Sequence, residues 1–281
     1  MPSAPPIEGK ESMLANSGKT ELKDQKFTAD VSEEKYTNFH FVRLVAKGRE
    51  FTNVDFRYCT FDTCYLRNCK FDSCDFTGCR FIGTNLHGST FSGCDFEYAA
   101  FERTDINNEV LSSGCPGSEN LKIRFARSLR MNYQQLGDAL SANKAIEVEL
   151  DATKEHLYKA WRSNESYYRK KYKSWHRAQH FLLWMNFKLL DLLWGNGESA
   201  WKLARAVLVV LALMTLFDVL NYRDSSLVRS YWNAFLQAPQ VFLGTANQAY
   251  FPSCYITLVT FVRLVLFGFF MAIIVKRFNR R

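Results

Sequence analysis

The chain has 281 residues, of which 47% are hydrophobic, and a formal net charge of +8. This length leaves room for more than one domain. The sequence holds no phosphate-binding loop, nucleophile elbow, metal-ligand cluster or convergent acid–base pair, so we expect no enzyme, no cofactor and no metal. Much of the positive charge lies at residues 154–177, where eight Lys and Arg accompany two Glu just before the most apolar part of the chain. We therefore expect no nucleic-acid partner.

The N-terminal residues mix Pro, Ser, Gly, Lys and Glu without apolar periodicity. They also lack the hydrophobic middle region of a signal peptide. We expect a disordered tail over residues 1–35.

A strict period of five begins at Phe51 and ends at Ile106. Twelve apolar residues follow it, and a small residue stands two positions before nearly every one. Neither a helix, at 3.6 residues, nor a strand, at 2.0, explains this period. The pattern resembles the pentapeptide-repeat family, whose members form a right-handed quadrilateral β-helix with both residues pointing inward. The resemblance implies a solenoid over 36–114, with regular repeats at 49–108.

Four repeats make one coil, so twelve repeats predict three coils. The aliphatic exceptions Leu66, Leu86 and Ile106 recur every 20 residues and form one column. Arg49 is the misfit at the small position, and we expect it to mark the mouth of the solenoid.

Six cysteines occupy small positions of the repeat. They lie on successive faces of the coil and cannot converge on one metal ion. We expect them to be interior, reduced and metal-free. The six are Cys59, Cys64, Cys69, Cys74, Cys79 and Cys94.

Some members of this family imitate DNA with an acidic surface and inhibit topoisomerases. From Phe51 to Ile106 the chain has eight Asp and Glu against five Lys and Arg, a net charge of −3. That is weak beside DNA, which carries one charge per about 1.7 Å. A scaffold, partner-docking or oligomer-capping role is favoured.

Gly114, Pro116 and Gly117 end the repeat, and helical spacing of Leu and Phe predicts a cytosolic helical linker over 115–180 that contains an α-hairpin. Its basic cluster is either a solvated helix face or a contact for anionic lipid. Residues 181–194 are apolar but too short to span. With the turn that follows, to residue 199, they predict an interfacial helix, the alternative being a buried helix of the cytosolic part.

Two apolar runs, Leu203–Tyr222 and Cys254–Val275, are each long enough to cross a hydrocarbon core of about 30 Å. Basic residues flank both runs on the side away from the loop that joins them. This bias predicts a multi-pass protein of the plasma membrane, the inner membrane in a bacterium, with both termini cytoplasmic.

The loop Arg223–Ser253 is longer than a turn needs, and its segment Ser230–Leu243 is mostly apolar. Residues 200–281 resemble the two-helix pore-loop ion channels, and the resemblance implies a transmembrane pore domain assembled from several chains, four in that family. The potassium filter motif is missing, and only one glycine matches it. Weak selectivity is the better inference. The pore and filter candidates are Gln240, Phe242, Leu243, Gly244, Thr245, Ala246, Asn247 and Gln248.

Two charges lie inside the apolar runs, Asp218 and Arg263. Charges within a membrane commonly pair, so we expect these two to pair within or between subunits.

The sequence thus predicts an oligomeric membrane ion channel, with a cytosolic repeat domain that senses a stimulus or docks a protein partner. The alternative is a membrane-anchored scaffold without conduction. The conducted ion, the stimulus and the physiological role stay open.

Overall fold

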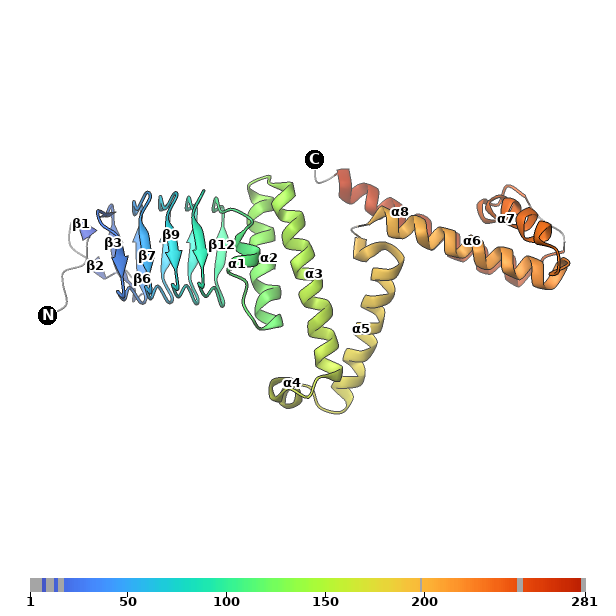
Figure 1. Ribbon diagram of the computed structural model, residues 1–281, viewed down its shortest axis with the longest axis horizontal. Helices are drawn as coiled ribbons and strands as arrows, with labels where there is room; N and C mark the ends of the chain where they lie inside the picture. Colours follow the sequence, from blue (N-terminus) through green and yellow to red (C-terminus); the bar gives the residue numbers. More distant parts are fainter. Residues whose placement is uncertain (1–6, 9–12, 15–17, 198, 247–249, 279–281) are drawn as a thin grey trace. The chain divides into compact units, whose positions relative to one another are not determined.

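The computed structural model describes residues 7–8, 13–14, 18–197, 199–246 and 250–278. It divides into two compact units, Met1–Lys173 and Ser174–Arg281. The first holds the strands and helices α1 to α4, and the second holds α5 to α8 (Figure 1).

The strands of the first unit form a β-solenoid (Figure 1). Paired strands are 20 residues apart in the sequence, which is the length of one coil. Phe81 lies beside Phe61 in one sheet and Phe91 beside Phe71 in another. Single bridges such as Tyr65 to Asn85 and Asp75 to Asp95 link successive coils on the other two faces. The predicted four-sided coil is confirmed. Its strands are β3 Thr20–Lys23, β4 Lys26–Phe27, β5 Val31–Ser32, β6 Phe39–Val42, β7 Glu50–Thr52, β8 Thr60–Asp62, β9 Lys70–Asp72, β10 Arg80–Ile82, β11 Thr90–Ser92 and β12 Ala100–Glu102.

The solenoid has about four turns and not three, because another coil precedes the regular repeats. Strand β3 pairs in parallel with β6, and β5 with β7, so the expected tail is wrong for residues 20–35. Two short strands precede them: β1 Ile7–Glu8 is antiparallel to β4, and β2 Met13–Leu14 is antiparallel to β3. Arg49 is half-buried between coils, 3.9 Å from Asp30, and does not mark the mouth.

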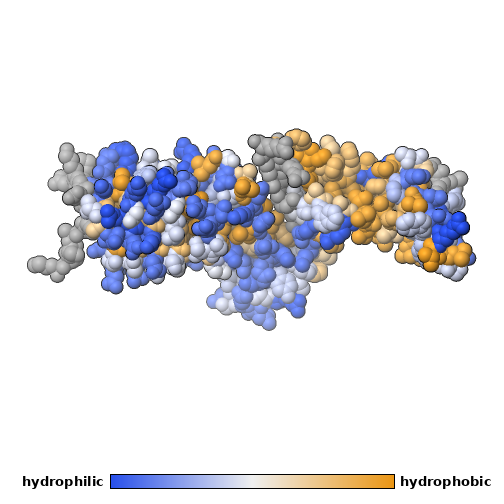
Figure 2. Space-filling view, turned by 45° about the horizontal axis from the view of Figure 1, so that its top comes forward, coloured by the Kyte–Doolittle hydropathy of each residue, from blue (hydrophilic) through white to orange (hydrophobic). Residues whose placement is uncertain are grey.

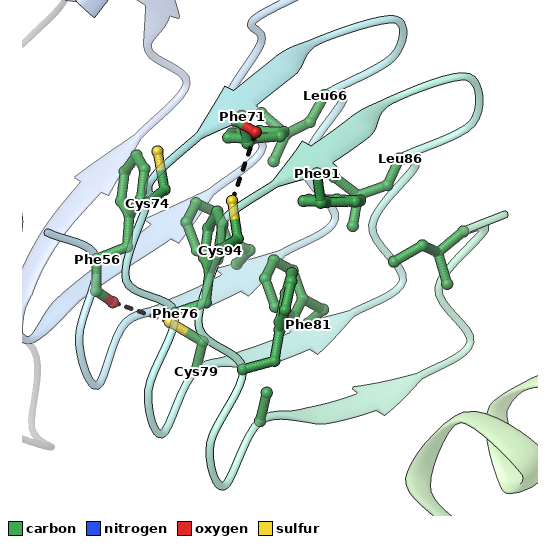
Figure 3. Packing of buried hydrophobic residues seen from close by; sticks show 14 of the residues in the cluster. Phe56, Leu66, Phe71, Cys74, Phe76, Cys79, Phe81, Leu86, Phe91 and Cys94 are labelled. Atoms are coloured by element: carbon green, nitrogen blue, oxygen red, sulfur yellow. Dashed lines mark hydrogen bonds between the residues drawn. The ribbon is translucent and has the colours of Figure 1, made fainter. Parts of the chain in front are cut away.

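Columns of stacked rings fill the interior. Phe61 and Phe81 have ring centroids 5.0 Å apart, and Phe56 and Phe76 lie 5.2 Å apart. The third column consists of Phe51, Phe71 and Phe91, at 4.9 and 5.2 Å. Leu66 and Leu86 occupy the fourth face, where the predicted aliphatic column is observed (Figure 3).

The six periodic cysteines are buried and free of disulfide bonds, as predicted. Each thiol donates to a backbone carbonyl 23 residues earlier, as Cys79 does to Phe56 at 2.8 Å and Cys94 to Phe71 at 3.4 Å (Figure 3). Thr84 and Ser89 make the same bond from equivalent positions. The small position therefore needs a compact side chain, and a hydroxyl or thiol there can pair with the preceding coil; Val54 and Ala99 fill it without a donor.

Helix α2, Glu119–Gln135, closes the C-terminal end of the solenoid, after a short helix α1, Val110–Ser113. Its side chains pair with the last coil: Ser128 accepts from Phe101 N at 2.9 Å, and Gln135 accepts from Arg103 N at 3.1 Å. The ring of Phe125 covers Phe96 and Phe101.

Helix α3, Ala139–Arg162, pairs with α2 as the predicted hairpin. Arg127 and Arg130 of α2 both bond to Glu149 of α3, at 2.9 and 3.0 Å. Asp138 caps α3 by accepting from Ser141 N at 3.0 Å. A short helix follows, α4 Ser166–Lys171.

The second unit consists of helices, and two of them are apolar and long enough to cross a membrane: Ala200–Tyr222 in α6 and Ser253–Val275 in α8. The whole set is α5 Trp175–Trp194, the 3-10 turn η1 Gly195–Gly197, α6 Ala200–Tyr222, α7 Val228–Leu243 and α8 Ser253–Phe278. Large apolar side chains cover their outer faces, among them Leu213, Leu220, Leu258 and Phe261 at 60% exposure or more. Figure 2 shows this surface as densely apolar.

Candidate functional site

Helix α7 lies between the candidate spans in sequence and folds back along them. Its small residues Ala234 and Ala238 are buried and share a narrow space with Met214 of α6 and Tyr255 of α8. Alanines four residues apart lie on one helix face and let two helices approach closely. Val241 and Phe242 extend this buried face to the end of α7.

The C-terminal end of α7 lies beside the middle of α8. Arg263 stands ten residues after Ser253, which is about 15 Å along a helix at 1.5 Å per residue. Its Nη1 is 3.4 Å from the carbonyl oxygen of Phe242. Helix α7 therefore begins near the end of α6 and descends to the mid-level of both candidate spans.

Gly244 ends α7 in a left-handed conformation, with φ +76°. Thr245 N donates to the carbonyl of Gln240 at 2.9 Å, and Ala246 N donates to the same oxygen at 3.3 Å. A Cβ at position 244 would also clash with the guanidinium of Arg263. The left-handed backbone conformation favours glycine here, whereas the flexible Arg263 side chain could move away from a Cβ.

The filter candidates gather around this helix end. Gln240, Leu243, Gly244 and Thr245 are exposed, Ala246 is half-buried and Phe242 is buried. The structure brings these six together in one chain; Asn247 and Gln248 lie outside the described residues. Residues 240–244 form the last turn of a helix and its cap, and not an extended filter strand.

Asp218 is buried near the C-terminal end of α6 and bonds to Arg223, with Nε 2.8 Å from Oδ2. The hydroxyl of Tyr250 donates to its other oxygen at 3.1 Å. Arg223 also donates to Gln237 of α7 at 2.5 Å. One network thus ties α6, α7 and the segment before α8 together.

This network corrects the within-chain form of one prediction, while pairing of Asp218 with Arg263 between subunits stays a prediction. Within the chain Asp218 pairs with Arg223 and not with Arg263, because Arg263 turns toward the end of α7. A carboxylate and a guanidinium five residues apart can meet where a helix ends, as Asp218 and Arg223 do at the end of α6. Arg223, Gln237 and Tyr250 lie outside the two apolar runs, so hydropathy does not indicate them as members of the network around Asp218. The position of Arg223, directly after the apolar run that holds Asp218, indicates it as a candidate partner of this carboxylate.

The start of α6 is tied to α5. Lys202 Nζ lies 2.6 Å from a carboxylate oxygen of Asp191, and Arg205 donates to the carbonyl of Leu192 at 2.9 Å. The ring of Trp194 stacks on Phe269 of α8 at 4.5 Å. Cations near a helix C-terminus are stabilised by the helix dipole, so these contacts fix the turn between α5 and α6.

The repeat unit offers no comparable chemistry in the part that the structure describes. No group of three His, Cys, Asp or Glu residues there could hold a metal ion. Burial raises the pKa of the Cys64 thiol to about 12 and holds that of Cys79 well above its usual value. Such thiols stay protonated and unreactive near neutral pH.

Comparison with known proteins gives matches for the repeat region. Eight copies of the pentapeptide-repeat family model match residues 50–88 and 69–108. Among solved structures, QnrB1, a plasmid-mediated fluoroquinolone resistance protein, is similar at 20% identity and a TM-score of 0.17. The match covers 32% of this chain and 56% of QnrB1.

A pentapeptide-repeat protein of the Arabidopsis thaliana thylakoid lumen is similar at 13% identity and a TM-score of 0.14, over 36% of this chain and 76% of that one. No curated protein sequence matches the chain. The family match and the 20-residue coil agree that residues 50–108 are pentapeptide repeats forming a β-solenoid.

Proposed function

We propose that this chain is the subunit of an oligomeric ion channel of the plasma membrane, with a cytosolic pentapeptide-repeat domain that senses a stimulus or docks a protein. One observation carries the proposal. Helix α7 starts beside the end of one candidate span and stops beside the middle of the next, where Arg263 meets the carbonyl of Phe242. That is the path of a re-entrant pore helix.

The apolar surface supports the membrane setting. Leu208, Leu213 and Leu220 are more than half exposed along α6, and Leu258, Phe261 and Phe267 are so along α8. In water these faces would form a continuous apolar surface far larger than soluble monomers expose. In the proposed setting lipid or other subunits cover these faces. The basic residues before the first span and after the second keep both termini in the cytoplasm.

The end of α7 supports assembly. Irregular backbone at membrane depth is tolerated only where protein or a water-filled cavity surrounds it. In a single chain Leu243, Gly244 and Thr245 are exposed at that level. Further copies would enclose them around a shared axis, and the resemblance to two-helix pore-loop channels suggests four.

The test is a cysteine-block experiment on purified full-length protein in planar bilayers. Thr245→Cys is made in a Cys254→Ser background, since Cys254 is the exposed native thiol among the eight cysteines. A charged thiol reagent added on the loop side should block the current. Ser225→Cys, in the exposed turn before α7, is the matched control and should bind the reagent with little effect on current.

Unhindered current after complete modification of Thr245→Cys would remove this helix end from the conduction path. No current from the parent protein, in any condition that keeps the oligomer intact, would leave the membrane-anchored scaffold. The polar solenoid surface suits that role equally, since it can dock a partner whether or not the membrane unit conducts.

A further inference from the structure

Within the part of the chain that the structure describes, no carboxylate pairs with the guanidinium of Arg263. Among the described residues, no Asp or Glu oxygen lies within 4.0 Å of it. Asp218, the other charge inside the spans, is neutralised by Arg223 at 2.8 Å. The charge that remains at the mid-level of α8 is therefore positive.

The helix end next to Arg263 offsets only part of this charge. A helix C-terminus carries roughly −0.5 of an elementary charge, so an arginine there leaves about +0.5 per chain. The loop and the outer halves of the spans do not reverse the sign. From residue 218 to residue 263 the charged residues are Asp218, Asp224, Arg223, Arg229 and Arg263, a net of +1.

Two carbonyl oxygens at this helix end, those of Gln240 and Phe242, already accept hydrogen bonds. The oxygen of Gln240 accepts from Thr245 N at 2.9 Å and from Thr245 Oγ1 at 3.1 Å, and that of Phe242 accepts from Arg263. A filter that selects cations replaces their hydration shell with free carbonyl oxygens. These two oxygens face donors instead.

We propose that the channel conducts small inorganic anions in preference to cations, and that Arg263 determines this preference. The inference rests on the proposed channel function and names the class of ion that passes. In an oligomer each subunit contributes one Arg263 at the level where the α7 helices end. A ring of like charges in a low-dielectric surrounding concentrates ions of the opposite sign.

The experiment measures reversal potentials of the full-length protein in planar bilayers under a potassium chloride gradient. For the wild type we expect a reversal potential shifted toward the equilibrium potential of chloride. Arg263→Gln should lower the chloride-to-potassium permeability ratio at least about sixfold, because a unit charge about 8 Å away at an effective dielectric constant of roughly 80 favours chloride about 2.4-fold and disfavours potassium by the same factor. Arg263→Lys keeps the charge and should keep the anion preference.

Arg229→Gln is the matched control, because Arg229 is exposed in the first turn of α7. Salt screens its charge over about 10 Å at 0.1 M, so the permeability ratio should change less than about twofold. Size-exclusion chromatography checks that each variant assembles. Should Arg263→Gln not assemble, the wild-type reversal potential and Arg263→Lys decide the question.

A wild-type reversal potential shifted toward the equilibrium potential of potassium overturns the anion preference, while the proposed channel function stands. The same permeability ratio in assembled Arg263→Gln and wild type overturns the role of Arg263. No wild-type current at all rejects the channel, and the anion preference with it.

Discussion

Asn132 of α2 and Thr104 of the last coil form two reciprocal hydrogen bonds. Thr104 N donates to Asn132 Oδ1 at 2.7 Å, and Asn132 Nδ2 donates to Thr104 O at 2.8 Å. Asn132 is fully buried. Its side-chain amide takes the place that the backbone amide of a further coil would occupy, so a helix can end a stack of strands without leaving their polar groups unpaired.

The first prediction concerns this pair. Asn132→Leu removes both bonds and leaves the buried N–H and C=O of Thr104 unpaired, at about 1–3 kcal/mol each. We expect the repeat unit to lose about 2–5 kcal/mol of stability, measured by urea unfolding of the full chain in detergent and followed by circular dichroism. Gln135→Ala is the control, because its bond to Arg103 N is exposed and should contribute no more than about 1 kcal/mol. Equal losses would mean that burial does not set the importance of the cap.

The second prediction concerns the ring columns. Phe76 is buried with Phe56 and Phe96 stacked at 5.2 and 5.0 Å, so Phe76→Ala leaves a cavity that both neighbours border. The expected cost is about 3–5 kcal/mol. The same urea titration with Arg67→Ala, an exposed residue on the face that holds Leu66, should shift stability by less than about 0.5 kcal/mol. A Phe76→Ala protein as stable as the control would contradict the stacked interior.

The third prediction uses thiol chemistry. Only a thiolate reacts readily, and burial raises the pKa of Cys64 to about 12, so at pH 8 its thiolate fraction is small. In the folded protein a small thiol reagent at pH 8 should modify Cys254 first and the half-buried Cys115 slowly. All eight cysteines should react in denaturant. Mass spectrometry of the labelled peptides gives the answer, and rapid labelling of Cys64 or Cys79 in the folded state would contradict their placement.

The fourth prediction tests the ion pair between Asp218 and Arg223. Breaking a buried ion pair by removing one partner costs about 3–5 kcal/mol, since the other charge is left uncompensated. Asp218→Asn and Arg223→Gln should each lower the thermal stability of the second unit, measured on the full chain in detergent, and the double change should cost less than the sum of the two. Asp224→Asn, an exposed neighbour, serves as control. Additive losses would show that Asp218 and Arg223 are independent.

The sequence predicts the solenoid well where its period is strict. The period of five does not predict the first coil, because its inward residues Phe27 and Val31 are only four residues apart. In addition, Glu34 and Phe39 stand at positions that small residues hold elsewhere. An end coil has neighbours on one side only, so larger side chains fit there. Periodicity alone cannot detect a coil with a missing residue.

The cap and the site depend on contacts that no local pattern encodes. Ser128, Asn132 and Gln135 are ordinary helix residues until the helix lies across the end of a sheet. Length and hydropathy predict the spans and α7. The carbonyl that Arg263 contacts can be identified only once α7 is seen to end beside it. The proposed pore axis would lie between several chains, and the sequence of one chain does not show how the chains are arranged.

The coil of 20 residues also makes the repeat unit extensible. Helix α2 bonds to backbone groups only from Phe101 to Thr104, within the last coil. A duplication of residues 60–79 would insert one whole coil, preserve every column of rings and present the same edge to α2. The solenoid would lengthen by one strand spacing, about 4.8 Å. Its reach can thus be changed in fixed increments, by an ancestor through tandem duplication or by a designer, without redesigning either end.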